Sequence, residues 1–133
     1  MSRDKEVYEP KPFGVDYVPQ KRRLKTKHGG WVHVGYASEI SVGKAKSVDF
    51  ENVKVAIFNI EGTYYAVKDA CPHAQYPVAK GSLKDAIVSC SSHNWRFDVT
   101  NGACTKAEHG MDVSQIVLRT FQVDIRGDEI WVK

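Results

Sequence analysis

The chain has 133 residues, a size that fits one domain with a single hydrophobic core. With 42% hydrophobic residues and a formal net charge of +3, its composition is that of an ordinary globular protein rather than a disordered one. No stretch approaches the roughly 20 apolar residues of a membrane-spanning helix, and the N-terminus lacks the apolar segment of a signal peptide. We therefore expect a cytoplasmic protein without a membrane span.

The positive charge is concentrated at the N-terminus. Residues 1–30 hold eight Lys and Arg against four Asp and Glu, whereas residues 31–133 hold eleven against twelve. The first segment lacks periodicity and ends at Gly29-Gly30, so we interpret residues 1–30 as an extended basic arm. The arm is either a solvated segment or a docking element for an acidic partner protein. Nucleic acid binding is not expected, because the basic run is short and no recognition fold surrounds it.

Several strands are indicated in chain order. Trp31–Ala37 alternates between apolar and polar positions and is predicted to be a strand. Val53–Ile60 and Thr63–Lys68 are rich in Val, Ile, Tyr and Phe and flank Glu61-Gly62, which predicts a hairpin. Ala86–Ser89 is predicted to be a further short strand.

The C-terminal third predicts two more hairpins. Asn101-Gly102 follows Trp95–Thr100 and is a strong signal for a two-residue turn. Ile116–Ile125 and Glu129–Lys133 are predicted to pair around residues 126–128. Many short strands, frequent turns and no segment with three convincing helical turns favour an all-β sandwich or barrel.

Two short motifs carry the chemistry of the chain. Cys71-Pro72-His73 and Cys90-Ser91-Ser92-His93 each offer one thiolate and one imidazole. Two soft anionic ligands with two nitrogen ligands suit iron–sulfur or zinc chemistry. In a Rieske-type [2Fe–2S] centre two cysteines hold one iron and two histidines hold the other, and the tight Cys-x-His spacing fits that arrangement.

The segment from Cys71 to Gly102 resembles the cluster region of Rieske-type ferredoxins. The resemblance includes Pro77, Gly81 and the run Trp95–Asp98, and it extends more loosely over residues 31–133. It implies an antiparallel β-sandwich or barrel as a base. A small cluster-binding subdomain, formed by two loops at about residues 69–80 and 89–98, would lie on that base.

The resemblance also implies one [2Fe–2S] cluster per chain and its ligands. Cys71 and Cys90 would bind the inner iron, and His73 and His93 the outer iron. The third cysteine, Cys104, is then left over and is expected to be a small core residue. An odd number of cysteines also argues against a disulfide framework.

Four other positions separate this chain from parts of the family. Respiratory Rieske proteins cross-link their loops through two extra cysteines, and the matching positions here are Tyr76 and Ser92, so the chain falls with the ferredoxin branch. High-potential members place a serine and a tyrosine where this chain has Trp95 and Phe97, which predicts a low reduction potential.

Two further positions depart from the family's glycines. The chain has Gln75 and Asn94 where glycine is common. Asparagine tolerates left-handed backbone well, whereas glutamine does so less readily. At Gln75 the resemblance therefore leaves the backbone shape of the first loop open.

The resemblance implies a one-electron carrier that passes electrons from a reductase to an oxygenase or another terminal redox enzyme. Such a protein is not itself an enzyme, although it can be a component of a multicomponent oxidoreductase, and no catalytic residue is expected. A complete Rieske oxygenase is not expected at this length. Two alternatives remain: a small subunit of a larger oxidoreductase of the nitrite reductase type, and a zinc-binding structural module with a Cys2His2 site. We expect a monomer that contacts redox proteins.

Overall fold

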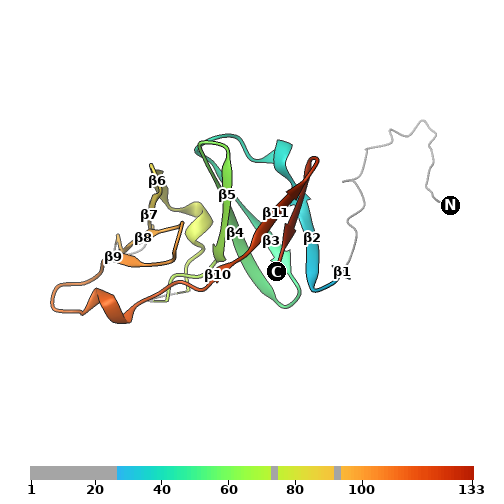
Figure 1. The fold of residues 1–133 in the computed structure, drawn as a ribbon. Helices are drawn as coiled ribbons and strands as arrows, with labels where there is room; N and C mark the ends of the chain where they lie inside the picture. The colour runs from blue at the N-terminus through green and yellow to red at the C-terminus, as the bar shows by residue number, and fades with distance from the viewer. Residues whose placement is uncertain (1–26, 73–74, 92–93) are drawn as a thin grey trace, which may run out of the picture.

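The computed structural model describes residues 27–72, 75–91 and 94–133, and within them it is entirely β (Figure 1). The described residues form twelve strands in three four-stranded sheets, in which each strand pair is antiparallel, together with three short 3-10 turns. The predicted all-β class is confirmed.

The strand order within each sheet follows from the pairing. The first sheet has the order β1 (Lys27–His28), β2 (Trp31–Tyr36), β12 (Glu129–Val132), β11 (Val123–Arg126). The second has the order β10 (Thr120–Phe121), β5 (Thr63–Lys68), β4 (Val53–Ile60), β3 (Ala45–Phe50). The third has the order β6 (Ser82–Lys84), β7 (Ile87–Ser89), β8 (Arg96–Asp98), β9 (Cys104–Lys106). The turns are η1 (Ala37–Glu39), η2 (Val78–Lys80) and η3 (Val113–Gln115).

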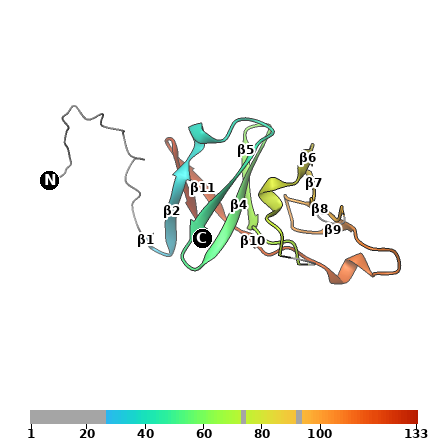
Figure 2. The same cartoon turned by 180° about the vertical axis from the view of Figure 1, so that it is seen from behind.

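The second sheet lies between the other two, as the front and back views show (Figures 1 and 2). Its strand β4 is buried on both faces. Val55 and Ile57 pack into a core shared with the first sheet, whereas Ala56 and Phe58 pack into a core shared with the third. Because successive strand residues point to opposite faces, a strand covered on both sides needs a continuous apolar run, and VAIF supplies it. The neighbouring strand β5 does the same with Ala66 and Val67, so the base and the small subdomain are joined through the two central strands of the second sheet.

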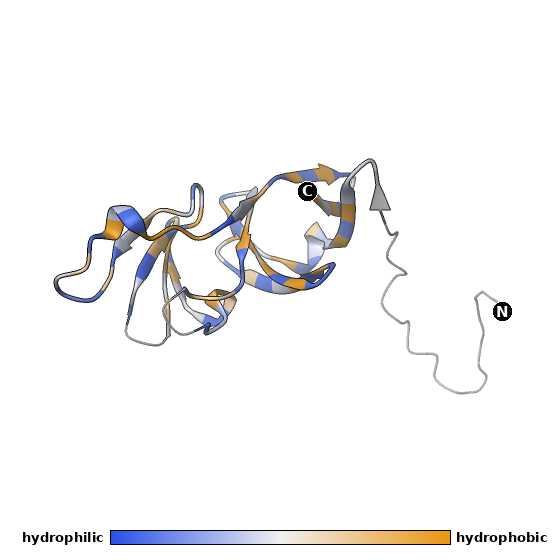
Figure 3. Cartoon of the chain, turned by 90° about the horizontal axis from the view of Figure 1, so that it is seen from below, coloured by the Kyte–Doolittle hydropathy of each residue, from blue (hydrophilic) through white to orange (hydrophobic). Residues whose placement is uncertain are grey.

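Hydropathy alternates along many of the other strands, as the view from below illustrates (Figure 3). In β3 the buried residues Val48 and Phe50 alternate with the exposed Ser47 and Asp49. This alternation is expected where one face of a strand meets the core and the other meets water. The sequence analysis nevertheless did not identify β3.

The hairpin predicted around Glu61-Gly62 is confirmed. Strands β4 and β5 pair from Ile60↔Thr63 to Val55↔Lys68. Both turn residues have positive φ, +53° at Glu61 and +93° at Gly62. Positive φ at both central residues is the property of a type I′ turn, whose twist matches that of the flanking strands.

The two-residue turn predicted at Asn101-Gly102 is wrong. Asp98 donates its backbone N–H to the carbonyl of Ala103, so residues 99–102 form a longer connection between β8 and β9. Of the two predicted turn residues only Gly102 has positive φ. The Asp98 carboxylate accepts hydrogen bonds from the N–H and hydroxyl of Thr100, which stabilises the longer connection.

The single long strand predicted over Ile116–Ile125 is also wrong. Val117 forms an isolated bridge with Ala103, Thr120–Phe121 pairs with β5, and only Val123–Arg126 pairs with β12. This segment runs along the molecule and contributes to all three sheets in turn. The final hairpin, with Arg126 opposite Glu129, is where the sequence placed it.

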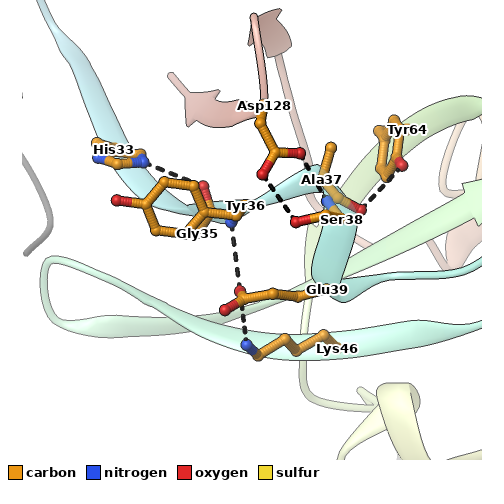
Figure 4. Close-up of polar contacts among 9 residues, drawn as sticks. All are labelled: His33, Gly35, Tyr36, Ala37, Ser38, Glu39, Lys46, Tyr64 and Asp128. Carbon is orange, nitrogen blue, oxygen red and sulfur yellow. Dashed lines mark hydrogen bonds and ion pairs between the residues drawn. The ribbon is translucent and has the colours of Figure 1, made fainter. Parts of the chain in front are cut away.

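The end of the base near η1 is fixed by polar contacts between β2, β5 and the β11–β12 turn (Figure 4). Ser38 donates its N–H and hydroxyl to the two carboxylate oxygens of Asp128, at 2.8 and 2.7 Å. The Tyr64 hydroxyl donates to the carbonyl of Ala37. His33 is buried and stacks on Trp131, which is the structural role expected for a histidine outside the two motifs.

Candidate metal centre

The first loop (residues 69–80) is anchored by a buried carboxylate. Asp69 follows β5 directly, and its backbone N–H donates to the carbonyl of Lys54 at 2.9 Å. Its carboxylate accepts the N–H of Ala79 at 2.8 Å, which ties the start of the loop to η2. A buried carboxylate is costly unless it is hydrogen-bonded, so this contact fixes the loop at both ends. The sequence analysis missed Asp69, although an acidic residue between an apolar strand and a cysteine motif is a usable signal.

Within that loop the backbone closes on itself. Cys71 donates its N–H to the carbonyl of Tyr76 at 2.8 Å, and Gln75 donates its N–H to the carbonyl of Cys71 at 2.7 Å. Gln75 has φ +60°, in the left-handed region. The first loop therefore has a left-handed residue at the position where the family usually has glycine, although that residue is glutamine.

The second loop (residues 89–98) repeats this geometry. Cys90 donates its N–H to the carbonyl of Trp95 at 2.7 Å, and Asn94 has φ +60°. In both loops the cysteine N–H bonds to the carbonyl five residues later, and the residue four positions after the cysteine is left-handed. The described parts of the two loops thus present their cysteines with the same backbone hydrogen bond and the same left-handed position.

The third sheet places the end of the first loop beside the second loop. Ser82 at the start of β6 pairs with Ser89 at the end of β7, and Ser89 pairs with Arg96 in β8. Gly81 lies so close to β7 that a Cβ added there would collide with the carbonyl oxygen of Ser89. Glycine is required here by this close approach of two backbones, since its φ is an ordinary −78°.

Burial differs sharply between the bases and the tips of the loops. The side chains of Cys71 and Cys90 are 0% and 2% exposed, and both belong to the same core. Pro72, Gln75, Ser91 and Asn94 at the tips are exposed, and Tyr76 is 49% exposed. The two thiols are therefore shielded from water, whereas the outer ends of both loops are open to it.

The predicted histidine ligands His73 and His93 lie outside the described residues. Among the residues that the structure does describe, no group of three or more His, Cys, Asp or Glu side chains gathers as a metal site would require. Of the four ligands predicted from the sequence, the structure therefore describes the two cysteines, and both are buried at the base of a loop.

The third cysteine is a core residue, as the sequence analysis expected. Cys104 is buried, and its Sγ donates to the carbonyl of Lys106 at 3.4 Å. Burial raises the pKa of this thiol above its usual range. Cys104 is held as a neutral thiol, and a neutral thiol is a poor metal ligand.

No helix in the described residues is long and apolar enough to cross a bilayer.

Comparison with known proteins identifies the family to which this chain belongs. The family model of the Rieske [2Fe-2S] domain matches residues 30–121. A 4beta-methylsterol monooxygenase from Methylococcus capsulatus is 28% identical over 127 residues, which cover 89% of this chain but only 34% of that protein. The biphenyl dioxygenase ferredoxin subunit of Pseudomonas sp. KKS102 is 37% identical over 48% of this chain and 60% of its own length. A naphthalene 1,2-dioxygenase ferredoxin component from Pseudomonas aeruginosa is 28% identical over 77% of this chain and 93% of its own.

Solved structures give the same fold. The ferredoxin of carbazole 1,9a-dioxygenase from Nocardioides aromaticivorans is 25% identical, with a TM-score of 0.69 over 77% of this chain and 95% of that one. Dicamba monooxygenase is 26% identical, with a TM-score of 0.68 over 77% of this chain and 33% of that one. The two buried thiols on like-shaped loops fit the cysteine ligands that a [2Fe–2S] cluster requires. The chain therefore belongs to the Rieske [2Fe–2S] family, whose domain implies a [2Fe–2S] cluster.

Proposed function

We propose that the chain is a one-electron carrier that passes electrons from a reductase to an oxygenase. The ferredoxin components of dioxygenase systems support this proposal, because one of them is matched over 93% of its length. We further propose a two-part organisation, a basic arm and a Rieske domain, in a monomeric cytoplasmic protein. The arm that the sequence analysis placed at residues 1–30 must end before β1, because Lys27 and His28 pair with Val32 and Trp31, and the proposed domain therefore includes β1 together with residues 31–133.

The observation that carries the proposal is the pair of like-shaped loops with buried Cys71 and Cys90. We propose that these two thiolates bind the inner iron of the cluster and that His73 and His93 bind the outer iron. When bound, the cluster takes up and releases a single electron. The closed backbone of each loop would hold its thiolate in place, and the surrounding core would keep water from the sulfur atoms. The exposed tips leave the opposite side of the site accessible to a partner protein.

The ligand assignment is tested by iron and sulfide analysis of purified variants. Cys71→Ala and His93→Ala should both lose the cluster and melt at lower temperature, because the binding energy of a metal site is also folding energy. Cys104→Ala and His109→Ala are the matched controls, since Cys104 is a buried thiol outside the loops and His109 is exposed. Two irons retained in Cys71→Ala or His93→Ala would refute the assignment.

The identity of the metal is tested on the unmodified protein. A [2Fe–2S] protein is reddish-brown, whereas a zinc protein is colourless. An EPR spectrum of the dithionite-reduced chain should show the low average g value of mixed histidine and cysteine ligation. A colourless protein with stoichiometric zinc would favour the structural zinc module instead.

A second candidate function follows from the match to the sterol monooxygenase. That match covers 89% of this chain, whereas residues 31–133 are about three-quarters of it, so the similarity extends into the basic arm. The chain could then be a firmly held redox subunit rather than a free carrier. Copurification with a catalytic subunit that persists at about 1 M salt would favour this candidate, because screening at that ionic strength releases a carrier held by exposed charges.

A further inference from the structure

Two clefts flank the first loop and together form a groove around it. One cleft has a volume of about 540 Å³ and lies between the β3–β4 hairpin and the loop. The other has a volume of about 340 Å³ and lies between the loop and the segment that leads into β10. Lys68, Ala70 and Gln75 line both clefts. Anything that occupies this groove would contact the loop that presents Cys71.

The groove is lined by four basic side chains, Lys54, Lys68, Lys80 and Arg119, and all of them are exposed. Lys54 pairs with Asp49 at 2.6 Å. No carboxylate in the described part of the chain lies within ion-pairing distance of Lys68, Lys80 or Arg119. The acidic residue of the lining, Asp69, is buried and holds the N–H of Ala79. The accessible charge of the groove is therefore positive.

The positive charge of the groove includes two basic side chains that repel each other. Lys68 and Arg119 are neighbours across the strand pair, since the N–H of Lys68 donates to the carbonyl of Arg119 at 2.8 Å. Like charges on adjacent strands destabilise a sheet. The guanidinium of Arg119 lies over the Phe121 ring at 4.5 Å, which holds it beside Lys68. Because residues 31–133 as a whole carry a net charge of −1, the groove does not simply reflect the charge of the domain.

Exposed apolar side chains accompany these cations. Val117, which lines the second cleft, is 62% exposed, and Tyr76, which follows Gln75, is 49% exposed. The aromatic Tyr76 and the guanidinium of Arg119 belong to the residue types that are enriched at protein interfaces. A site for a small anion would instead need donors that converge on one point, whereas these four cations are spread along two clefts.

We propose that this groove docks an acidic segment of the redox partner protein. The proposal rests on the proposed function, which supplies the partner, and it adds where and by what chemistry that partner binds. Carboxylates of the partner would pair with Lys68, Lys80 and Arg119, and its apolar side chains would cover Val117 and Tyr76. Docking beside the first loop would bring the partner next to the loop that presents Cys71 and, in the proposed site, His73.

The test measures binding of a fluorescein-labelled deca-glutamate peptide to the full-length, cluster-loaded protein by fluorescence anisotropy. The charge reversal Lys68→Glu/Lys80→Glu changes two groove residues. Lys44→Glu/Lys84→Glu is the matched control, because both lysines are exposed, neither lines the groove, and the change in net charge is the same. At about 0.1 M ionic strength the Debye length is about 10 Å, so distant charges contribute little. We expect the groove variant to bind at least about tenfold more weakly than the control variant.

Three results would overturn the proposal. Equal weakening in the two double variants would mean that only net charge matters. Loss of binding in Arg22→Glu/Arg23→Glu alone would assign the peptide to the basic arm. Displacement of the peptide by inorganic phosphate, but not by chloride at equal ionic strength, would identify a small-anion site. Two irons per chain are verified in each variant, so a failed docking surface is distinguished from a failure of the proposed function.

Discussion

At the scale of single residues, two left-handed positions set the shape of the cysteine loops. Gln75 and Asn94 both have φ +60°, and each lies four residues after a cysteine. A left-handed conformation costs an ordinary residue about 1–2 kcal/mol, and asparagine tolerates it better. The first loop therefore stores more strain than the second, although their backbones are alike.

This difference predicts that Gln75→Gly stabilises the protein, by about 1 kcal/mol in free energy of unfolding, whereas Asn94→Gly has a smaller effect. Thermal unfolding followed by circular dichroism and by cluster absorbance measures both. Gln115→Gly is the control, because Gln115 lies in η3 without a positive φ, and there glycine should only destabilise. A lower melting temperature for Gln75→Gly would show that the side chain of Gln75 stabilises the loop by more than the strain costs.

The core beside the cysteines predicts a low reduction potential. Phe97 is fully buried and Trp95 nearly so, and neither side chain has a hydroxyl that could donate to sulfur. Because reduction adds negative charge to the site, the absence of such donors disfavours the reduced state. We expect a potential near about −150 mV, toward the low end of the Rieske range.

Phe97→Tyr should raise this potential if its hydroxyl reaches a cysteine sulfur, and protein-film voltammetry measures the change. Phe50→Tyr is the matched control, because it adds a buried hydroxyl to the other core and should leave the potential unchanged. A wild-type potential above roughly +100 mV would contradict the argument.

Some of these residues could be found from the sequence and others could not. The resemblance to Rieske-type ferredoxins pointed to Gln75 and Asn94 as unusual, and both are left-handed. Asp69 was not recognised, and Gly81 entered only through the resemblance, because their roles depend on Ala79 and Ser89, which only the folded chain brings close. The roles of His73 and His93 stay predictions.

At the scale of elements, the contact between Gly81 and β7 aligns the two loops. A methyl group at Gly81 would meet the Ser89 carbonyl, which is backbone and cannot rotate away. Gly81→Ala should therefore force β6 and β7 apart and cost about 1–3 kcal/mol, as overpacking usually does.

Iron content and melting temperature measure the effect of Gly81→Ala, and both should fall. Gly35→Ala is the control, since a Cβ there meets only the side chains of Glu39 and Val48, at 3.6 Å or more. Full iron content with an unchanged melting temperature in Gly81→Ala would show that the two loops do not depend on this contact.

Elements were predictable where local residues determine them. Glu61-Gly62 lies between two apolar strands, and both residues take the φ that the turn requires, so the hairpin follows from the sequence. Asn101-Gly102 has a similar local signal, but the chain there forms the longer connection of residues 99–102. In it the carbonyl of Gly102 accepts the N–H of Leu118, a contact between segments remote in sequence. The division of residues 116–125 among three sheets has the same cause, because the pairing partners are remote in sequence.

At the scale of the whole molecule, the base and the cluster subdomain have separate cores joined through β4 and β5. The described structure of the base begins at Lys27–His28, which pair with Val32 and Trp31. The cysteines lie in the core on the other side of the second sheet (Figure 1). Substitutions or deletions at the N-terminal edge of the base should therefore have little effect on the cysteine site.

This separation predicts the effect of deleting residues 1–26 while retaining β1. The visible spectrum and the potential should be unchanged, because the deletion leaves every described strand and both loops in place. The salt dependence of electron transfer should weaken, since an exposed basic segment acts through long-range attraction that salt screens. Stopped-flow reduction by a ferredoxin reductase across a range of ionic strengths measures this, with Arg22→Glu/Arg23→Glu as a full-length comparison. If the deletion bleaches the cluster or unfolds the protein, the arm is part of the fold and does not end before β1. If salt dependence stays the same while the spectrum is intact, attraction of the partner comes from the groove around the first loop rather than from the arm.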